Sequence, residues 1–440
     1  LTVIGGKDCS GGFGYELMSC VDFVDFVGNA ECEVTIDRLV EHIRNPKTRP
    51  CNVLYRDDSG HVVTSPQKAN LDLETLPFPE YDFQDFPLRH SDIILPLELG
   101  RGCPWGRCTF CPDVSYHVRC QSKTAKRVAM EVDYYLNISP DLKNFIILDS
   151  DALKDPQMIV DLAQHLEEKG LAFHFGEFRA ERMEKRVLES LLRFGRWISQ
   201  AFDDRLLRLM KKGVTALRNV EVLKMAAEIG IPLQFNLFTC YPKMTYRDLA
   251  ENLRVMESIA HILISENIEI YPGEFYLPTD TAIFLDVGGY DLQKNTESIF
   301  SDVFEAFPMA SYSNYPYPYT FDNHAEQVVM SERIRKKVDE IKTREPGENF
   351  MTYEIDRGAL NVRVCRDGRS STYTLVGLEK DVYLEALERS AKPDEVSEHL
   401  HIARKKVKAV LDDLEKKGLV LYSSDKKRFL SLAMKLPGTS

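Results

Sequence analysis

The sequence predicts an α/β protein whose central part is a partial (β/α)6 TIM-like barrel, preceded by a Rossmann-like fragment and followed by a winged-helix-like domain. Six apolar stretches alternate with helical stretches between residues 93 and 277, and the first 65 residues follow a strand–helix–strand–helix order. The last part of the chain combines strand-like runs with three helical stretches and a hairpin. We therefore expect domains at 1–65, 93–330 and 331–440, with a linker at 66–92.

The composition narrows the class of protein. The 440 residues are 44% hydrophobic and 28% charged, which suits two or three folded domains. The net charge of −12 disfavours nucleic-acid binding as the main function. No apolar run approaches the roughly 18 residues that span a bilayer, and the first residues, LTVIGGKDCSGGFGYE, do not resemble a signal peptide. We expect a cytoplasmic protein with no membrane partner.

Residues 1–65 have the order of the closing half of a doubly wound domain. The apolar strand LTVIGG leads into a glycine-rich loop, GGKDCSGGFG, and a possible helix, and a second apolar stretch, VDFVDFVG, is followed by the helical pattern VTIDRLVEHIR. Because the chain begins on a strand without a methionine, we expect the first half of this domain to be missing. Residues 66–92 are rich in proline and aromatic residues and predict an extended linker.

Residues 93–330 predict six βα units. The expected strands are IILPLEL, NFIILD, LAFHFGE, RWISQAF, IPLQFNLF and NIEIYPGEFYL, and the expected helices lie at 124–137, 156–169, 180–194, 216–229 and 246–262. Three glycines, Gly170, Gly195 and Gly230, stand where helices should end. Right-handed crossovers curl such a chain into a barrel, whose active site lies at the carboxyl ends of the strands.

Three cysteines follow the first of these strands directly, in LELGRGCPWGRCTFCPD. Cys103, Cys108 and Cys111 therefore lie at the catalytic end of the predicted barrel. A structural zinc site normally takes four protein ligands, and Cys120 is the only nearby fourth candidate. Three thiolates on one loop instead suit a [4Fe–4S] cluster with one open iron, which can bind a small molecule. The ten cysteines of the chain are too sparse for a disulfide scaffold.

This loop resembles the cysteine loop of the radical S-adenosylmethionine (SAM) superfamily. The ending CTFC after the first strand matches the family, although four residues rather than the usual three separate the first two cysteines. The resemblance implies cluster ligation by Cys103, Cys108 and Cys111, and packing of Phe110 near the adenine of SAM. It also implies SAM cleavage to a 5′-deoxyadenosyl radical and a reducing partner such as flavodoxin or ferredoxin.

A longer stretch resembles the radical SAM enzymes that mature ribosomally made peptides. DDRLLRLMKKGVTALRNVEVLKMAAEIGI is similar to the segment after the fourth strand of that subfamily. The same subfamily has a cobalamin-binding-type domain in front, whose landmarks correspond here to Gly5 and Gly6 and to GNAECE, from Gly28 to Glu33. Three other landmarks differ: DSDALKD replaces GGE, ISQ replaces GIE, and TCYPKM replaces GFPGE.

The ends of the second, third and fourth strands supply candidate cofactor-binding residues. Asp149 and Asp151 can accept hydrogen bonds from the methionyl ammonium of SAM, or else cap the helix that follows. Glu177 and Arg179 suit the ribose hydroxyls and the cofactor carboxylate, or else form an ion pair heading the next helix. Gln200 stands where the family often has a glutamate. No residue is assigned a catalytic role.

Two other features have a structural alternative. His174 alternates with aromatic residues and is better explained as a core histidine than as a metal ligand. The aromatic run NYPYPYTF, residues 314–321, suits either stacking on a ligand or a strap over the barrel.

The amino-terminal glycines are candidates for corrin binding. A backbone without side chains at Gly5, Gly6, Gly11, Gly12 and Gly14 can approach a flat corrin or its nucleotide tail, and the alternative is a set of ordinary turns. His42 and His61 are expected on a helix and in a turn rather than at an axial position. If cobalamin binds, we expect it base-off, without a protein histidine on the cobalt.

The carboxy-terminal domain predicts a winged helix. ALNVRVCRDGRSSTYTLV has strand character, three helical stretches follow, and Gly418 stops the last helix before the wing. A winged helix commonly binds nucleic acid, and ARKKVK supplies local positive charge. In peptide-modifying radical enzymes, however, a small domain of this shape holds the precursor peptide as an added strand. We expect a precursor peptide as partner, and not nucleic acid.

These features predict an enzyme that modifies a ribosomally made peptide by radical chemistry. The expected reaction is cobalamin-dependent C-methylation at an unactivated carbon, with a [4Fe–4S] cluster, SAM and cobalamin as cofactors. One alternative is radical crosslinking, cyclisation or epimerisation without cobalamin. A second alternative is an iron–sulfur sensor that binds DNA through its winged helix.

Overall fold

The computed structural model describes two compact parts of the chain, each treated separately below. The described residues are 1–6, 9, 11–29, 31–48, 50–65, 71–83, 89–113, 120–174, 177–190, 196–197, 201–273, 281–286, 288–290, 292–294, 319–321 and 324–435. The first unit comprises Leu1–Tyr81, Glu98–Arg127 and Tyr276–His324, and the second comprises Asp82–Leu97, Val128–Phe275 and Ala325–Ser440. The four-part division expected from the sequence stays a prediction.

The first unit opens with a four-stranded sheet in the order β1-β2-β3-β4. The elements are β1 (Val3–Ile4), α1 (Gly11–Cys20), β2 (Phe26–Gly28), α2 (Cys32–Arg44), β3 (Val53–Arg56) and β4 (Val62–Thr64). β1 and β2 are parallel, as the expected strand–helix–strand order requires, whereas β3 and β4 form an antiparallel hairpin that the sequence analysis missed. Apolar side chains of α1, of the sheet and of the segment between α1 and β2 form the core, among them Met18, Val27 and Val24.

The rest of the first unit consists of short elements. β6 (Gly100–Arg101) and β7 (Gln121–Ser122) pair antiparallel on either side of the cysteine loop. Further along the chain lie α11 (Ala282–Leu285), η4 (Gly288–Tyr290), β13 (Leu292–Lys294) and β14 (Tyr319–Phe321). β13 and β14 pair antiparallel, so the end of the aromatic run is a strand, and its earlier part, 314–318, lies outside the described residues. Of the expected linker, residues 71–83 and 89–92 are described: the first part contains no helix or strand, and the second forms the short 3-10 helix η2 (His90–Asp92).

All six strands expected between residues 93 and 277 are present in the second unit. β5 (Ile94–Leu97), β8 (Asn144–Ile147) and β9 (Ala172–His174) form one parallel sheet in that order. β10 (Arg196–Trp197), β11 (Leu233–Phe238) and β12 (Ile268–Gly273) form a second parallel sheet. The fold is therefore mixed α/β with parallel strands, and its closure into a partial barrel stays a prediction.

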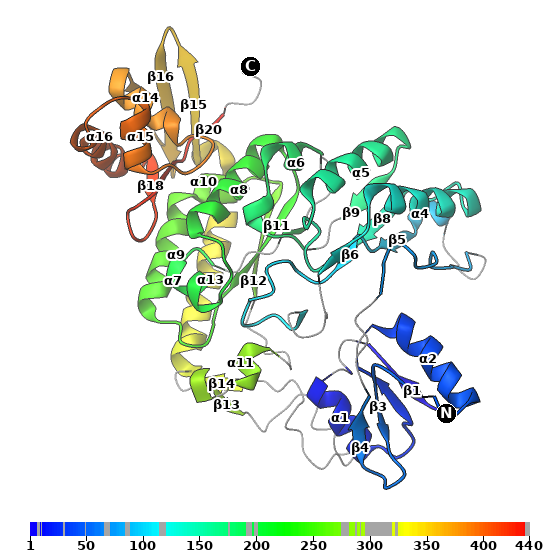
Figure 1. Ribbon diagram of the computed structural model, residues 1–440. Coiled ribbons are helices and arrows are strands. Elements are labelled where there is room, and N and C mark those ends of the chain that lie inside the picture. Colours follow the sequence, from blue (N-terminus) through cyan, green and yellow to red (C-terminus); the bar gives the residue numbers. More distant parts are fainter. Residues whose placement is uncertain are drawn as a thin grey trace. The chain divides into compact units, whose positions relative to one another are not determined.

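The helices between these strands are α4 (Ala125–Ile138), α5 (Pro156–Glu168), η3 (Ala180–Arg182), α6 (Lys185–Ser190), α7 (Asp204–Leu209), α8 (Ala216–Ile229), α9 (Tyr246–Ser258) and α10 (Ala260–Leu263). α4, α5, α8 and α9 follow the predicted positions, whereas the helix predicted at 180–194 is divided into η3 and α6 over its described part, and α7 was not predicted. Gly170 and Gly230 follow α5 and α8 with φ values of 65° and 81°, which confirms them as helix stops. Gly195 lies outside the described residues. In Figure 1, α4, α5, α6 and α8 follow one another along the outer side of the strands.

The second unit ends in a long helix and a small module. α13 (His324–Lys342) and η5 (Pro346–Glu348) lead into residues 350–435, here called the C-terminal module. Its elements are β15 (Phe350–Asp356), β16 (Ala359–Arg366), β17 (Arg369–Leu375), α14 (Gly377–Glu385), α15 (Pro393–His399), α16 (Arg404–Lys416), β18 (Val420–Tyr422), β19 (Phe429–Ser431) and β20 (Met434–Lys435). The three helices and the β18–β19 hairpin confirm the elements expected of a winged helix. The strands β15 and β20 were not expected.

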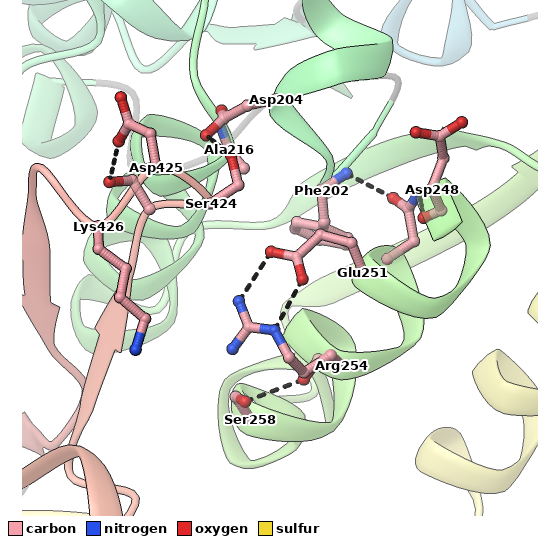
Figure 2. Close-up of polar contacts among 12 residues, drawn as sticks. Phe202, Asp204, Ala216, Asp248, Glu251, Arg254, Ser258, Ser424, Asp425 and Lys426 are labelled. Carbon is pink, nitrogen blue, oxygen red and sulfur yellow. Dashed lines mark hydrogen bonds and ion pairs between the residues drawn. The ribbon is translucent and has the colours of Figure 1, made fainter. Parts of the chain in front are cut away.

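The C-terminal module is held against the helices of the parallel sheets by polar contacts. Lys224 Nζ on α8 donates to the carbonyl oxygens of Leu387 and Ser431, at 2.6 and 2.9 Å. His261 Nε2 on α10 lies 3.1 Å from the carbonyl oxygen of Leu432. Ser424, in the loop between β18 and β19, donates to Asp204 at the start of α7, as Figure 2 shows. The module is therefore docked through both its strands and its wing.

No helix in the described part of the chain combines the length and the hydrophobicity needed to cross a membrane.

Candidate functional site

The cysteine loop of the first unit is closed at its base by the β6–β7 pair. Gly100 of β6 has to be a glycine, because a Cβ there would lie 2.2 Å from the carbonyl oxygen of Gln121 on β7. The backbone passes through positive φ at Gly102 and Gly106, at 69° and 53°, so that the loop turns back within a few residues. This local geometry places the three cysteines on one short loop.

The cysteines offer the right chemistry for an iron–sulfur cluster. Cys103, Cys108 and Cys111 are all outside any disulfide, and Cys108 is 8% exposed. The amide of Cys111 donates to the carbonyl oxygen of Cys108 at 3.4 Å, which folds the end of the loop into a turn. Three thiolates each bind a different iron of a [4Fe–4S] cluster, so the donor set fits this group.

A site for a single metal ion has stricter requirements. It needs at least three ligand atoms converging on one point. Within the described ranges no group of three or more His, Cys, Asp or Glu side chains is arranged in that way. Cys120, the fourth ligand that the zinc alternative requires, is exposed and stands just before β7.

Phe110 lies next to a buried anchor of the same loop. Its neighbour Thr109 is 1% exposed, and the Thr109 carbonyl oxygen accepts a hydrogen bond of 3.2 Å from the amide of Ile283 on α11. Phe110 itself is half-buried. Its role against the adenine of SAM stays a prediction.

An arginine that the sequence analysis did not single out stands two residues before Cys103. Arg101 Nε donates to Glu98 at 2.7 Å, and its two Nη atoms donate to Glu33 at 3.1 and 2.5 Å. Glu31 lies 3.6 Å from Arg101 Nη1. Burial raises the pKa of Glu31, and the Glu33 carboxylate beside it acts in the same direction, while Arg101 opposes both. The GNAECE turn and the cysteine loop thus meet at one guanidinium.

The two aspartates after β8 lie in different environments. Asp149 forms a buried ion pair with Lys154 at 2.5 Å. Asp151 has no exposed surface, and its Oδ1 accepts from the amide of Leu153 at 3.2 Å, whereas its Oδ2 has no hydrogen-bond partner among the residues that the structure describes. Burial raises the pKa of Asp151, although Arg182 and other nearby cations oppose this shift.

The helix-cap alternative for these aspartates is wrong. The cap of α5 is Asp155, whose side chain accepts from the amides of Gln157 and Met158. Neither Asp149 nor Asp151 therefore caps α5. A buried carboxylate oxygen without a partner has the chemistry to accept a hydrogen bond from the ammonium of SAM, and this role stays a prediction.

The residues after β9 lie at the same edge of the sheet. Glu177 is exposed, and its carbonyl oxygen accepts a hydrogen bond of 2.8 Å from the amide of Ala152, which joins the loops after β8 and β9. Arg179 is 4% exposed, pairs with Glu181 and donates to the carbonyl oxygen of Lys212. The ion-pair alternative is therefore present at Arg179, and binding of SAM by either residue stays a prediction.

Two further candidates have different outcomes. Gln200 lies outside the described residues. His174 ends β9 and is half-buried, and no metal-binding group of three side chains includes it among the residues that the structure describes.

The amino-terminal glycines divide into two groups. Gly5 and Gly6 follow β1, and Gly6 has a φ of 116° with open space where a Cβ would stand. Gly11, Gly12 and Gly14, by contrast, belong to α1 rather than to a loop, which corrects the expected glycine-rich loop. A Cβ at Gly14 would lie 2.0 Å from the carbonyl oxygen of Cys9, so this glycine allows packing within the chain. Approach to a corrin stays a prediction for Gly5 and Gly6.

The two amino-terminal histidines lie where the sequence placed them. His42 is on α2, and its Nδ1 lies 2.6 Å from the carbonyl oxygen of Thr48. His61 follows a turn before β4 and is exposed.

Comparisons with known proteins identify the central part of the chain. Residues 97–256 match the family model of the radical SAM superfamily. The chain is 19% identical over 247 residues to an uncharacterized methyltransferase, PH0819, of Pyrococcus horikoshii, covering 54% of this chain and 53% of that protein. It is 21% identical over 240 residues to a putative methylthiotransferase, MJ0865, of Methanocaldococcus jannaschii, covering 51% of each. The chain thus spans about half the length of these relatives.

Solved structures show the same fold. The cobalamin-dependent SAM radical enzyme OxsB, with aqua-cobalamin bound, matches with a TM-score of 0.60 at 16% identity, over 77% of this chain and 54% of that one. The radical SAM methyltransferase TsrM from Kitasatospora setae matches with a TM-score of 0.54 at 12% identity, over 79% of this chain and 71% of that one. The family match shows that residues 97–256 are a radical SAM domain, a kind of domain that uses a [4Fe–4S] cluster and SAM.

Proposed function

We propose that this chain is part of a radical SAM enzyme that methylates an unactivated carbon of a ribosomally made peptide with the help of cobalamin. The observation that carries the proposal is the loop of three cysteines within a domain that matches the radical SAM family model. The fold shared with OxsB and TsrM, whose structures are of cobalamin-dependent or methyltransferase enzymes, supports the cobalamin and methylation parts.

The chain supplies distinct groups for this chemistry. Cys103, Cys108 and Cys111 would hold the cluster, and Asp151 Oδ2, which has no partner among the described residues, would accept a hydrogen bond from the SAM ammonium. Arg179 is committed to Glu181 and to the Lys212 carbonyl, so its part is to hold the loop after β9 in place. When bound, the cluster and SAM supply a 5′-deoxyadenosyl radical that removes a hydrogen atom from the substrate, and cobalamin supplies the methyl group.

The C-terminal module is the proposed site for the peptide. β17 stands at the edge of the sheet β17-β16-β15-β20 and pairs with β16 alone among the described strands, and most of its residues are exposed. Such an edge offers backbone donors and acceptors to an added strand. The wing, which a DNA-binding winged helix would place on the duplex, is instead tied to Asp204 through Ser424. This contact favours a peptide over DNA as the partner.

The first test is cofactor loading under anaerobic conditions. The wild-type protein is expected to bind one [4Fe–4S] cluster and, under strong reductant, to convert SAM to 5′-deoxyadenosine. A variant with Cys103, Cys108 and Cys111 changed to alanine is expected to fold but to bind no cluster, because all three protein ligands are gone. The matched control is Cys120→Ala, which removes the exposed cysteine beside β7 and should retain the iron. Loss of metal in Cys120→Ala would favour the zinc alternative.

The second step of the test identifies the reaction. The protein is reconstituted with hydroxocobalamin and incubated with SAM and peptides encoded beside the gene. A stoichiometric corrin spectrum and a peptide heavier by one methyl group are expected. If the protein modifies a peptide without binding corrin, the proposed methylation is wrong, and crosslinking, cyclisation or epimerisation takes its place as the proposed reaction. A cluster that never yields 5′-deoxyadenosine would favour the sensor alternative.

A further inference from the structure

Arg101 joins two segments of the first unit that are far apart in the sequence. Its guanidinium binds Glu98 three residues before it, and Glu33, which lies 68 residues away in the first turn of α2. Glu31, the residue before α2, lies 3.6 Å from the same guanidinium. The side chains of Arg101 and Glu31 are each 12% exposed, so this contact is shielded from solvent.

The contact depends on the planar guanidinium of arginine, which carries several N–H donors. Nε and Nη2 bind the two oxygens of Glu98 at 2.7 and 3.1 Å. Nη1 and Nη2 bind the two oxygens of Glu33 at 3.1 and 2.5 Å. Two carboxylates are therefore each held by a two-pronged pair of hydrogen bonds, which the single ammonium of lysine cannot reproduce.

The position of Arg101 in the chain connects this contact to the cysteine loop. Arg101 is the last residue of β6, and its backbone pairs with Gln121 of β7 across the base of the loop. Cys103 follows after one glycine, Gly102. Because β6 has no room for a side chain at Gly100, the strand is seated tightly on β7. The Arg101 side chain and the one residue between Arg101 and Cys103 thus connect the first turn of α2 to the first cysteine.

We propose that Arg101 is a positioning residue that couples the start of α2 in the amino-terminal domain to the cluster-binding loop. This inference rests on the proposed function in one respect, namely that Cys103, Cys108 and Cys111 hold a cluster. Loading the loop then orders the first turn of α2 through Arg101, Glu33 and Glu31. The amino-terminal domain and the cluster thus respond to each other within one unit, whether or not the domain holds a corrin.

Hydrogen exchange with and without the cluster tests this coupling. In the wild-type protein, reconstitution of the cluster is expected to slow amide exchange at residues 32–36 several-fold. The variants R101Q and E33Q are both expected to lose this difference, because each breaks the two-pronged contact. R101K keeps the charge but not the geometry and is expected to recover little of it. The matched control is R38Q, which removes the exposed Arg38–Glu41 pair on the same helix and should behave like wild type.

The two variants also separate positioning from simple electrostatics. R101Q removes a positive charge and E33Q removes a negative charge. If Arg101 acted only through its charge, the two variants would shift the reduction potential of the cluster in opposite directions, and both would keep the difference in amide exchange between the loaded and the empty protein. A positioning role predicts that both variants lose the coupling. The proposal would be overturned if amide exchange at residues 32–36 of the wild-type protein did not change on cluster loading. It would also be overturned if R101Q and E33Q kept the full difference in exchange. A wild-type protein that takes up no cluster would instead show that the proposed function itself is wrong.

Discussion

Single buried residues decide how the C-terminal module is held. Lys224 is 3% exposed and His261 is 8% exposed, and each donates to a backbone carbonyl of the segment Ser431–Leu432. Burial lowers the pKa of Lys224 to about 8, so this lysine still carries its charge at pH 7. Burial lowers the pKa of His261 to about 4, so the histidine is neutral there and uses its Nε2 proton for the hydrogen bond.

The lowered pKa of His261 predicts that the docked module is sensitive to acid. An unfolded histidine titrates near its ordinary pKa of about 6.5, so between about pH 6.5 and pH 4 the unfolded chain binds more protons than the folded one. The stabilisation is present above about pH 6.5 and is lost as the pH falls through about 4, by roughly 3 kcal/mol in all. His261→Gln keeps a donor but does not titrate. Its free energy of unfolding is expected to vary less with pH over this interval.

Denaturant unfolding at a series of pH values measures this difference. The matched control is His399→Gln, which changes an exposed histidine of the same module and should leave the pH dependence close to that of wild type. An unchanged acid slope in His261→Gln would show that other groups cause it.

At the scale of elements, the β6–β7 pair determines the shape of the cysteine loop. It is only two residues long on each side, and its two strands approach each other closely at Gly100. An alanine at position 100 would place its Cβ against backbone atoms of Gln121 and Ser122, at 2.2 and 2.9 Å, and backbone cannot rotate away as a side chain can.

Gly100→Ala is therefore expected to open the base of the loop. Overpacking of this kind typically costs about 1–3 kcal/mol, and we expect the variant to retain much less iron after reconstitution. Iron and sulfide analysis together with the visible spectrum measures this loss. Gly347→Ala is the control, because a Cβ at that glycine meets nothing within 4 Å. Full cluster content in Gly100→Ala would show that the loop does not need the strand pair.

At the scale of the whole molecule, the arrangement of the C-terminal module separates the two candidate partners. Ser424 of its wing donates a hydrogen bond to Asp204. Asp204 also accepts a hydrogen bond of 2.8 Å from the amide of Ala216, which holds its side chain against the start of α8 (Figure 2). The outer edge of β17 is exposed, as are the basic side chains in the first turns of α16, Arg404, Lys405, Lys406 and Lys408. A peptide that adds a strand would use the first surface, and DNA would use the second.

Hydrogen exchange of the module distinguishes these two surfaces. Peptides encoded beside the gene are expected to slow exchange in β17, residues 369–375, because new backbone hydrogen bonds form along that edge. A variant with Arg404, Lys405 and Lys408 changed to glutamine should show the same protection. Protection confined to 404–408, or produced by duplex DNA and not by peptide, would contradict the peptide assignment.

The sequence by itself determined the local elements and the chemistry of the cysteine loop. The six parallel strands, the helix stops at Gly170 and Gly230 and the wing hairpin were predictable because each depends on periodicity and turn residues within a short window. Cys103, Cys108 and Cys111 were proposed as cluster ligands from their position on one loop and from the family ending CTFC, and their ligand role stays a prediction. The radical SAM match over residues 97–256 confirms the superfamily to which this loop was assigned.

Only the tertiary structure decided which polar groups meet. Lys154 forms an ion pair with Asp149, whereas one oxygen of Asp151 has no partner within the described part of the chain. Arg101 binds Glu33, which lies 68 residues away in the sequence. Ser424 reaches Asp204 across 220 residues. A charged or polar side chain has many possible partners, and its sequence neighbours do not reveal which one the fold will bring within 3 Å. These pairings depend on long-range packing. They distinguish side chains that are engaged in contacts within the fold from those that are candidates for binding a cofactor.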